Sequence, residues 1–179
     1  MNTETPLPSA NTETAAADTT ALPLPSLAAA LSEGVQFKRI LTTVDFSEAS
    51  TKGLAYALEL ATQYGSELRL LHVVEFNYAG SEFGAVELSR MASDMEETAV
   101  QQLEAWIAAL KSPVKTEGVV KCGRAYAEIV EAAKELPADL IVMASHGHTS
   151  LAHVLLGSTV ERVVRYAPCP VLVVRSRKA

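Results

Sequence analysis

Apolar residues follow two alternating spacings along this chain. Short, continuous apolar runs recur five times and predict strands over 38–44, 67–74, 114–121, 139–145 and 170–174. Between these runs, apolar residues recur every three or four positions, which is the spacing of one helical face. We therefore expect four helices, over about 48–64, 86–111, 125–136 and 158–167.

Small and polar residues mark the ends of these predicted helices. The run Asp45-Phe46-Ser47 offers a capping side chain to the first helix, and Gly65 is a natural stop for it. A loop over 75–85 is long enough to cover a ligand. The stripe of the second helix that we expect to face the core comprises Leu88, Met91, Met95, Ala99, Leu103, Ile107 and Leu110, together with Trp106.

The alternation of strands and helices predicts the class of fold. The helical spacers are long enough for crossovers, so a parallel sheet with right-handed connections is favoured. We expect an α/β, Rossmann-like, doubly wound sheet of five parallel strands with helices on both faces. Periodicity alone does not give the strand order. The order 3-2-1-4-5, which we expect, would bring the first and fourth strands together, and such sheets bind ligands where the order reverses.

Composition divides the chain into a tail and one domain. Residues 1–34 are rich in Ala, Thr, Pro and Ser, lack aromatic residues, and are expected to be a disordered, low-complexity tail. They hold four acidic residues and no basic one, so residues 35–179 carry −2 of the formal charge of −6. A nearly neutral domain without clustered basic charge argues against nucleic-acid binding.

Neither a membrane segment nor a disulfide framework is predicted. The start of the chain lacks the positive charge and compact apolar run of a secretory signal, and no run approaches the length of a bilayer span. We expect a soluble, cytoplasmic protein that does not contact membranes. Cys122 and Cys169 lack metal-site spacing and are expected as free thiols in or near the core.

Histidines raise the alternative of a metal site. His146, His148 and His153 lie close in sequence, and imidazole is a common ligand of zinc, copper and nickel. No nearby Cys completes such a site and the HExxH motif is absent, so we expect no metal bound by these three residues. His72, on the second predicted strand, is expected to have a backbone partner.

The stretch 144–158 has the composition of a phosphate-binding loop. It joins the fourth predicted strand to the start of a helix through Gly147 and Gly157, which would let backbone amides approach phosphate oxygens. Ser158 and Thr159 add hydroxyl groups at the helix start. The alternative remains open that Gly147 serves a tight turn and that Gly157 and Ser158 only cap the helix.

Two further positions suit a nucleotide. Asp45 could accept hydrogen bonds from ribose hydroxyls or help to hold a metal that accompanies phosphates, although an aspartate here is equally typical of a helix N-cap. Val73, at the end of the second strand, could line a slot for adenine, or it could be an ordinary strand valine.

Four segments and one glycine pattern carry a family resemblance over residues 37–175. The segments are Ile40-Leu-Thr-Thr-Val-Asp-Phe-Ser47, Leu71-His-Val-Val74, Asp139-Leu-Ile-Val-Met143 and Ala167-Pro-Cys-Pro-Val-Leu-Val-Val-Arg175. The pattern is Gly-x2-Gly-x9-Gly-Ser/Thr, written here with Ala144, Gly147, Gly157 and Ser158. In these features the chain resembles the universal stress proteins of the nucleotide-binding type.

The resemblance implies an ATP site, with Mg²⁺ as the accompanying ion. It places Asp45 at the ribose, Val73 near adenine, and Thr43 and Val44 beside the base. Ala144 adds a methyl group where the family has a glycine, so we expect weaker binding. His148 stands where relatives often carry Arg or Lys, so we expect weaker compensation of phosphate charge and pH-dependent binding. The complete set of expected binding residues is Thr43, Val44, Asp45, Val73, Met143, Ala144, Gly147, His148, Gly157, Ser158 and Thr159.

Two classes of function remain from the sequence. The first is an ATP-binding regulatory or signalling module of the stress response, acting on a client that the sequence does not identify. The second is a nucleotide-free, dimeric interaction module of the same fold. The Walker lysine motif and the GxSxG elbow are absent, so we expect slow ATP hydrolysis or none, and no catalytic residues. The resemblance also implies a homodimer that pairs through strand 171–174.

Overall fold

The structure is a computed structural model that describes residues 34–75, 85–147 and 156–175. Contacts divide the chain into two units, Met1–Val35 and Gln36–Ala179, and the second unit carries the fold. The predicted tail over 1–34 lies almost wholly outside the described residues. Of the predicted covering loop over 75–85, only the two end residues are described. His148 and His153 also lie outside the described residues.

All the predicted strands and helices are present, with ends that differ by at most two residues. The strands are β1 Arg39–Thr43, β2 Glu67–Val74, β3 Thr116–Cys122, β4 Leu140–Ala144 and β5 Val171–Val174. The helices are α2 Glu48–Tyr64, α3 Ala85–Ala109, α4 Ala125–Glu135 and α5 Ser158–Tyr166. No helix within the described ranges is both long enough and apolar enough to cross a bilayer.

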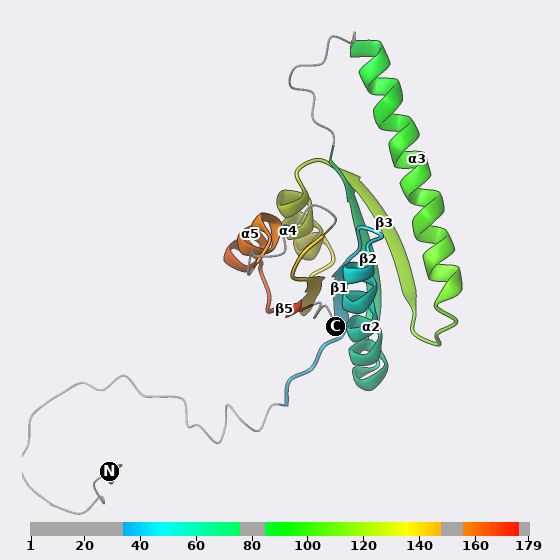
Figure 1. The fold of residues 1–179 in the computed structure, drawn as a ribbon. Helices are drawn as coiled ribbons and strands as arrows, with labels where there is room; N and C mark the ends of the chain where they lie inside the picture. Colours follow the sequence, from blue (N-terminus) through cyan, green and yellow to red (C-terminus); the bar gives the residue numbers. More distant parts are fainter. Residues whose placement is uncertain (1–33, 76–84, 148–155, 176–179) are drawn as a thin grey trace, which may run out of the picture. The chain divides into compact units, whose positions relative to one another are not determined.

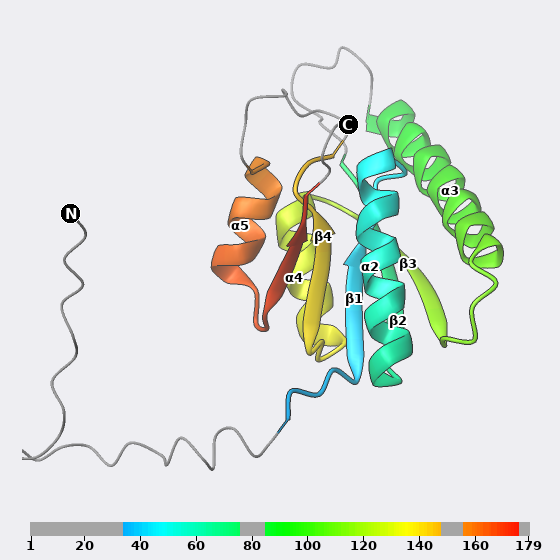
Figure 2. The same cartoon turned by 60° about the horizontal axis from the view of Figure 1, so that its bottom comes forward.

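The strands form one parallel sheet in the order β3-β2-β1-β4-β5, which confirms the expected order. Helices α2 and α3 cover one face, and α4 and α5 cover the other (Figures 1 and 2). Because every connection is a crossover, the carboxyl ends of all five strands lie along the same edge. That edge carries the segments that the sequence marked as a binding site.

Side chains of each strand alternate between two hydrophobic clusters. On β1, Ile40 belongs to the cluster under α2 and α3, whereas Leu41 belongs to the cluster under α4 and α5. Both side chains are completely buried. All five residues of β4 are buried, as expected for a central strand covered on both faces.

Helix α2 begins and ends at the residues that the sequence indicated. The Ser47 hydroxyl accepts a hydrogen bond from the Ser50 N–H at 3.1 Å, so that Ser47 is the N-cap. At the other end, Gly65 adopts a left-handed conformation with φ 66°, and its N–H donates to the carbonyl of Ala61. These local signals fix where the chain turns back toward the sheet.

Helix α3 departs from the expectation that its whole apolar stripe is buried. Ala99 and Leu103 are buried, but Met91 and Met95 are 40% and 44% exposed. The helix is 25 residues long, and its first half extends past the carboxyl ends of the strands (Figure 1). The prediction that Met91 and Met95 lie in the core was therefore wrong, because the buried part of this stripe begins only at Ala99.

The two cysteines also differ from one another. Both are free, as expected; Cys169 is half-buried against the cluster under α4 and α5. Cys122 is exposed at the end of β3, so the prediction that it lies in or near the core was wrong.

Candidate functional site

Asp45 and Gly147 meet at the carboxyl edge of the sheet. Asp45 follows β1 and Gly147 follows β4, and these two strands are direct neighbours. The contact is so close that a Cβ atom built on Gly147 would overlap the Oδ2 atom of Asp45. The juxtaposition expected from the strand order is therefore present.

The Asp45 carboxylate is fixed by the chain that follows it. Its Oδ1 atom accepts a hydrogen bond from the Ser47 N–H at 3.0 Å and another from the Ser47 hydroxyl. Ser47 rather than Asp45 caps α2, so the N-cap alternative for Asp45 is wrong. Asp45 instead supports the capping residue with one oxygen and presents the other toward Gly147.

Helix α5 begins at the same edge. Its N-cap is Gly157, whose N–H donates to the carbonyl of Ser145 at 3.0 Å and is thus already used. The amides of the next residues, Ser158 and Thr159, belong to the first turn and have no acceptor within the helix. The Val160 amide likewise has no acceptor within the helix, so the donors available to an anion are these three amides and the hydroxyls of Ser158 and Thr159, rather than the amide of Gly157.

Neither backbone conformation nor packing explains the glycine at 157. Its φ and ψ are −69° and 151°, which any residue adopts. A Cβ at this position would meet the carbonyl oxygen of Ser145 at 3.5 Å and a methyl group of Val160 at 4.0 Å, both ordinary contacts. A small residue is thus not required by the described protein atoms.

Met143 and Ala144 lie beneath the site. They are 3% and 8% exposed, respectively. A Cβ on Gly53 would come within 3.3 Å of the Ala144 amide nitrogen, which shows how closely α2 packs over this position. Because both side chains are buried, they can affect a bound ligand mainly by fixing the position of the backbone at the end of β4. The expectation that the Ala144 methyl group weakens binding remains a prediction.

The expected base-binding residues occupy the ends of β1 and β2. Val44 is 3% exposed, and its N–H donates to the Leu71 carbonyl at 2.9 Å. Thr43 and Val73 are half-buried. The Nδ1 atom of His72 lies 2.8 Å from the carbonyl oxygen of Val44, which confirms the expected backbone partner of this histidine.

A groove that the sequence did not indicate lies beside these strand ends. It has a volume of about 420 Å³ and is lined by the end of β2 and by residues of the exposed half of α3. We call it the α3 groove; its described lining residues are Phe46, His72, Val73, Val74, Glu75, Asp94, Met95, Thr98, Ala99 and Gln102. It was missed because Met95 belongs to a stripe whose spacing predicts burial.

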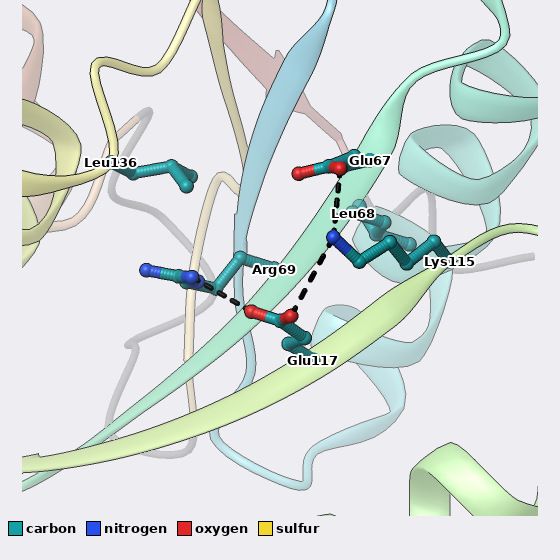
Figure 3. A pocket seen from close by; sticks show the side chains of 6 residues that line it. All are labelled: Glu67, Leu68, Arg69, Lys115, Glu117 and Leu136. Atoms are coloured by element: carbon teal, nitrogen blue, oxygen red, sulfur yellow. Dashed lines mark hydrogen bonds and ion pairs between the residues drawn. The ribbon is translucent and has the colours of Figure 1, made fainter.

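A second hollow lies at the opposite, amino end of the strands. Figure 3 shows Lys115 between Glu67 and Glu117, at 2.8 and 3.9 Å, and Arg69 bound to Glu117 at 2.8 Å. The bond to Glu67 raises the pKa of Lys115, and the bond from Arg69 lowers that of Glu117. With a volume of about 10 Å³, the hollow has room for a water molecule and no organic ligand.

The described residues do not supply a metal centre. No group of three His, Cys, Asp or Glu side chains suited to a metal occurs among them. His146 is described, and its Nδ1 atom lies 2.9 Å from the Ser145 hydroxyl oxygen. His148 and His153 lie outside the described residues, so the three-histidine alternative is not tested.

Comparisons with known proteins agree with this geometry. Residues 36–175 match the model of the universal stress protein family. A universal stress protein of Methanocaldococcus jannaschii is 33% identical over 145 residues, covering 79% of this chain and 84% of the relative. The structure of the universal stress protein UspA from Lactobacillus plantarum superposes with a TM-score of 0.66 at 28% identity, covering 79% of this chain and all of the other.

A more distant structure shares the fold alone. It is a universal stress protein in complex with cAMP, with a TM-score of 0.58 and 20% identity, covering 79% of this chain and 99% of that one. The family match covers most of the chain, and the relatives match along most of their own lengths. This chain belongs to the universal stress protein family.

Proposed function

We propose that this protein binds an adenine nucleotide, ATP together with Mg²⁺, and acts as a regulatory module of the stress response according to whether it is loaded. The contact between Asp45 and Gly147 carries this proposal. It joins an acidic side chain to the glycine that follows β4, at the point where strand order reverses, which is where doubly wound sheets bind their ligands.

The residues around this contact fit the parts of a nucleotide. The Oδ2 atom of Asp45 is an acceptor suited to a ribose hydroxyl or to the hydration shell of Mg²⁺. The first-turn amides of Ser158 and Thr159 suit a phosphate at the positive end of the α5 dipole. No contact within the described chain requires a small residue at position 157. The glycine there leaves room for that phosphate to approach.

Charge favours binding over catalysis. The described residues of the proposed site include no Lys or Arg, so the phosphates would be held by backbone amides, hydroxyls and the metal ion. Phosphoryl transfer depends on cations that stabilise charge in the transition state. We therefore expect slow hydrolysis of ATP or none; turnover near one per second would contradict this, because it is typical of kinases.

The chemistry of the site favours ATP, because the start of α5 and the glycine that follows β4 suit a chain of phosphates.

Calorimetric titration with ATP and Mg²⁺ tests the proposal. We expect the wild type to bind and Gly157→Asp to lose binding, because a carboxylate at the helix start would repel phosphate. Gly34→Asp is the matched control, since it adds the same charge where a Cβ atom would meet no described residue within 4 Å apart from its two chain neighbours. Absence of heat from the wild type would favour the nucleotide-free interaction module instead.

An edge strand supports a second proposal, that the protein forms a homodimer. Among the described strands, β5 pairs only with β4, so its other edge is available to a second copy. Its residues Val171, Leu172 and Val173 are only half-buried. Light scattering should give twice the chain mass at micromolar concentration; a monomer throughout that range would refute the dimer.

A further inference from the structure

The α3 groove has the size and the composition of a small-molecule site. Its volume of about 420 Å³ falls within the range of about 300–1,000 Å³ that is typical of ligand pockets. Phe46, Val74, Met95 and Ala99 make its apolar walls. Met95 is 44% exposed, so an apolar guest would cover surface that now faces water.

The charged groups of the groove have one sign. Glu75 and Asp94 line it, and none of its described lining residues is Lys or Arg. One oxygen of Glu75 accepts the N–H of Ala125 at 2.7 Å, which holds this carboxylate at the start of α4. Within the described part of the chain, the Asp94 carboxylate makes no hydrogen bond or ion pair, and the Thr98 hydroxyl donates to the backbone carbonyl of Asp94 instead, which leaves the carboxylate to a guest.

The acidic character continues beyond the groove. Val74 lies in register with Cys122 of β3. The thiol of Cys122 lies near Glu96 of α3 and Glu128 of α4. Burial, together with the charge of these two carboxylates, raises the pKa of the Cys122 thiol. The ammonium group of the nearby Lys121 is paired with the Glu135 carboxylate at 2.7 Å, so it is not free to offset the negative charge of Glu96 and Glu128.

We propose that the α3 groove is a second binding site, for a small amphipathic cation in which a protonated amine is joined to an aromatic or aliphatic body. The apolar body would lie against Phe46, Met95 and Ala99, and the ammonium group would lie near Asp94 and Glu75. The same carboxylates disfavour phosphate, so the groove and the nucleotide site select opposite charges.

The two sites are adjacent and share Val73, but they otherwise consist of different residues. Phe46 follows Asp45 directly, and Val73 borders both sites, whereas the α3 residues belong to the groove alone. The phosphate-binding positions at the start of α5 do not line the groove. The inference therefore stands whether or not the protein binds ATP.

Trp106 is a convenient reporter for this site. It is the only tryptophan of the chain, and its ring centroid lies 5.3 Å from that of Phe46, a lining residue. Titrations followed by its fluorescence would use 4-phenylbutylamine, its neutral analogue 4-phenylbutanol and its anionic analogue 4-phenylbutyrate. These probes share one apolar body and differ in charge.

We expect the amine to bind with a dissociation constant of about 1 mM or below, as suits so small a ligand. The alcohol should bind about three- to five-fold more weakly, and the carboxylate more weakly still. Asp94→Asn should weaken binding of the amine about three-fold and leave that of the alcohol unchanged. Glu97→Gln is the matched control on the same turn, because Glu97 does not line the groove.

Two outcomes would overturn the proposal. One is equal affinity for the three probes; the other is the same loss of amine binding in Asp94→Asn and Glu97→Gln, which would indicate a general effect of net charge. Gly157→Asp should retain amine binding even though it removes the proposed nucleotide site. Loss of amine binding in that variant would contradict a separate groove.

Discussion

The Asp45 carboxylate occupies the space that a side chain on Gly147 would need. The two residues are therefore coupled, since the glycine permits the aspartate to keep the position in which Ser47 holds it. A change at either one should act through the other.

Gly147→Ala tests this coupling. The added methyl group should displace Asp45 and weaken nucleotide binding about ten-fold or more, because a hydrogen bond to a charged acceptor is lost. Since a side-chain end can move, the free energy of unfolding should change by less than about 1 kcal/mol. Calorimetry and urea denaturation measure the two effects.

The double variant Asp45→Ala with Gly147→Ala is the control. If the glycine acts through the aspartate, the double variant should bind no more weakly than Asp45→Ala alone. Additive losses would show that Gly147 serves the ligand independently.

Gly157→Ala should also separate ligand binding from folding. The new Cβ would make only ordinary contacts with the protein, so the free energy of unfolding should stay within about 1 kcal/mol of the wild type. Nucleotide affinity should nevertheless fall, because the methyl group would narrow the approach of phosphate. Strong destabilisation in urea would instead support a purely structural role for this glycine.

Ser47→Ala should destabilise the protein by about 1 kcal/mol, because the N-cap of α2 is lost. It also removes the hydroxyl that donates to Asp45, so nucleotide affinity should fall with stability. Thr62→Ala, on the exposed side of the same helix, is the control. Equal unfolding midpoints for the two variants in urea would contradict the assigned cap.

Cys122 should react slowly with iodoacetamide at neutral pH. Burial and the charges of Glu96 and Glu128 raise the pKa of its thiol, and the thiolate is the reactive form. Because the folded state holds this proton more tightly, the thiol's contribution to stability is present at neutral pH and falls as pH rises through the folded-state pKa. Glu96→Gln should shift the rate profile, recorded from about pH 7 to about pH 10, toward lower pH.

The Glu97→Gln variant is the control for this shift. Glu97 neighbours Glu96 in sequence but does not contribute to the raised pKa of Cys122. An equal shift in both variants would show that net charge, rather than the local carboxylate, controls the thiol.

The fold was predictable because each element carries its own signal. β4 is apolar throughout since it is covered on both faces, and α2 ends at Gly65 because that residue takes a left-handed conformation. The strand order could not be read from these signals, since periodicity is a property of single elements. Once β1 and β4 are placed side by side, the contact of Asp45 with Gly147 follows from where the two strands end.

The remainder of the site depends on features that no local pattern carries. Periodicity predicts which face of α3 is apolar, but it does not say where the sheet ends, so the exposure of Met95 and the α3 groove were missed. Likewise, the amide of Gly157 was expected to face phosphate, but it donates to the carbonyl of Ser145, twelve residues earlier. A hydrogen bond between residues so far apart depends on the path of the chain between them, which sequence spacing does not determine.

The central place of β1 has a consequence during synthesis. Asp139, just before β4, accepts the N–H groups of Lys38 and Arg39 at 2.8 Å, across about a hundred residues of sequence. A ribosome adds about 5–20 residues per second, so β1 waits about 5–20 s for its second neighbour. During that interval, the backbone N–H and C=O groups along one edge of β1 have no partner strand and can pair with another chain. The two halves of the proposed nucleotide site first meet when β4 arrives, so ATP cannot guide the earlier steps of folding.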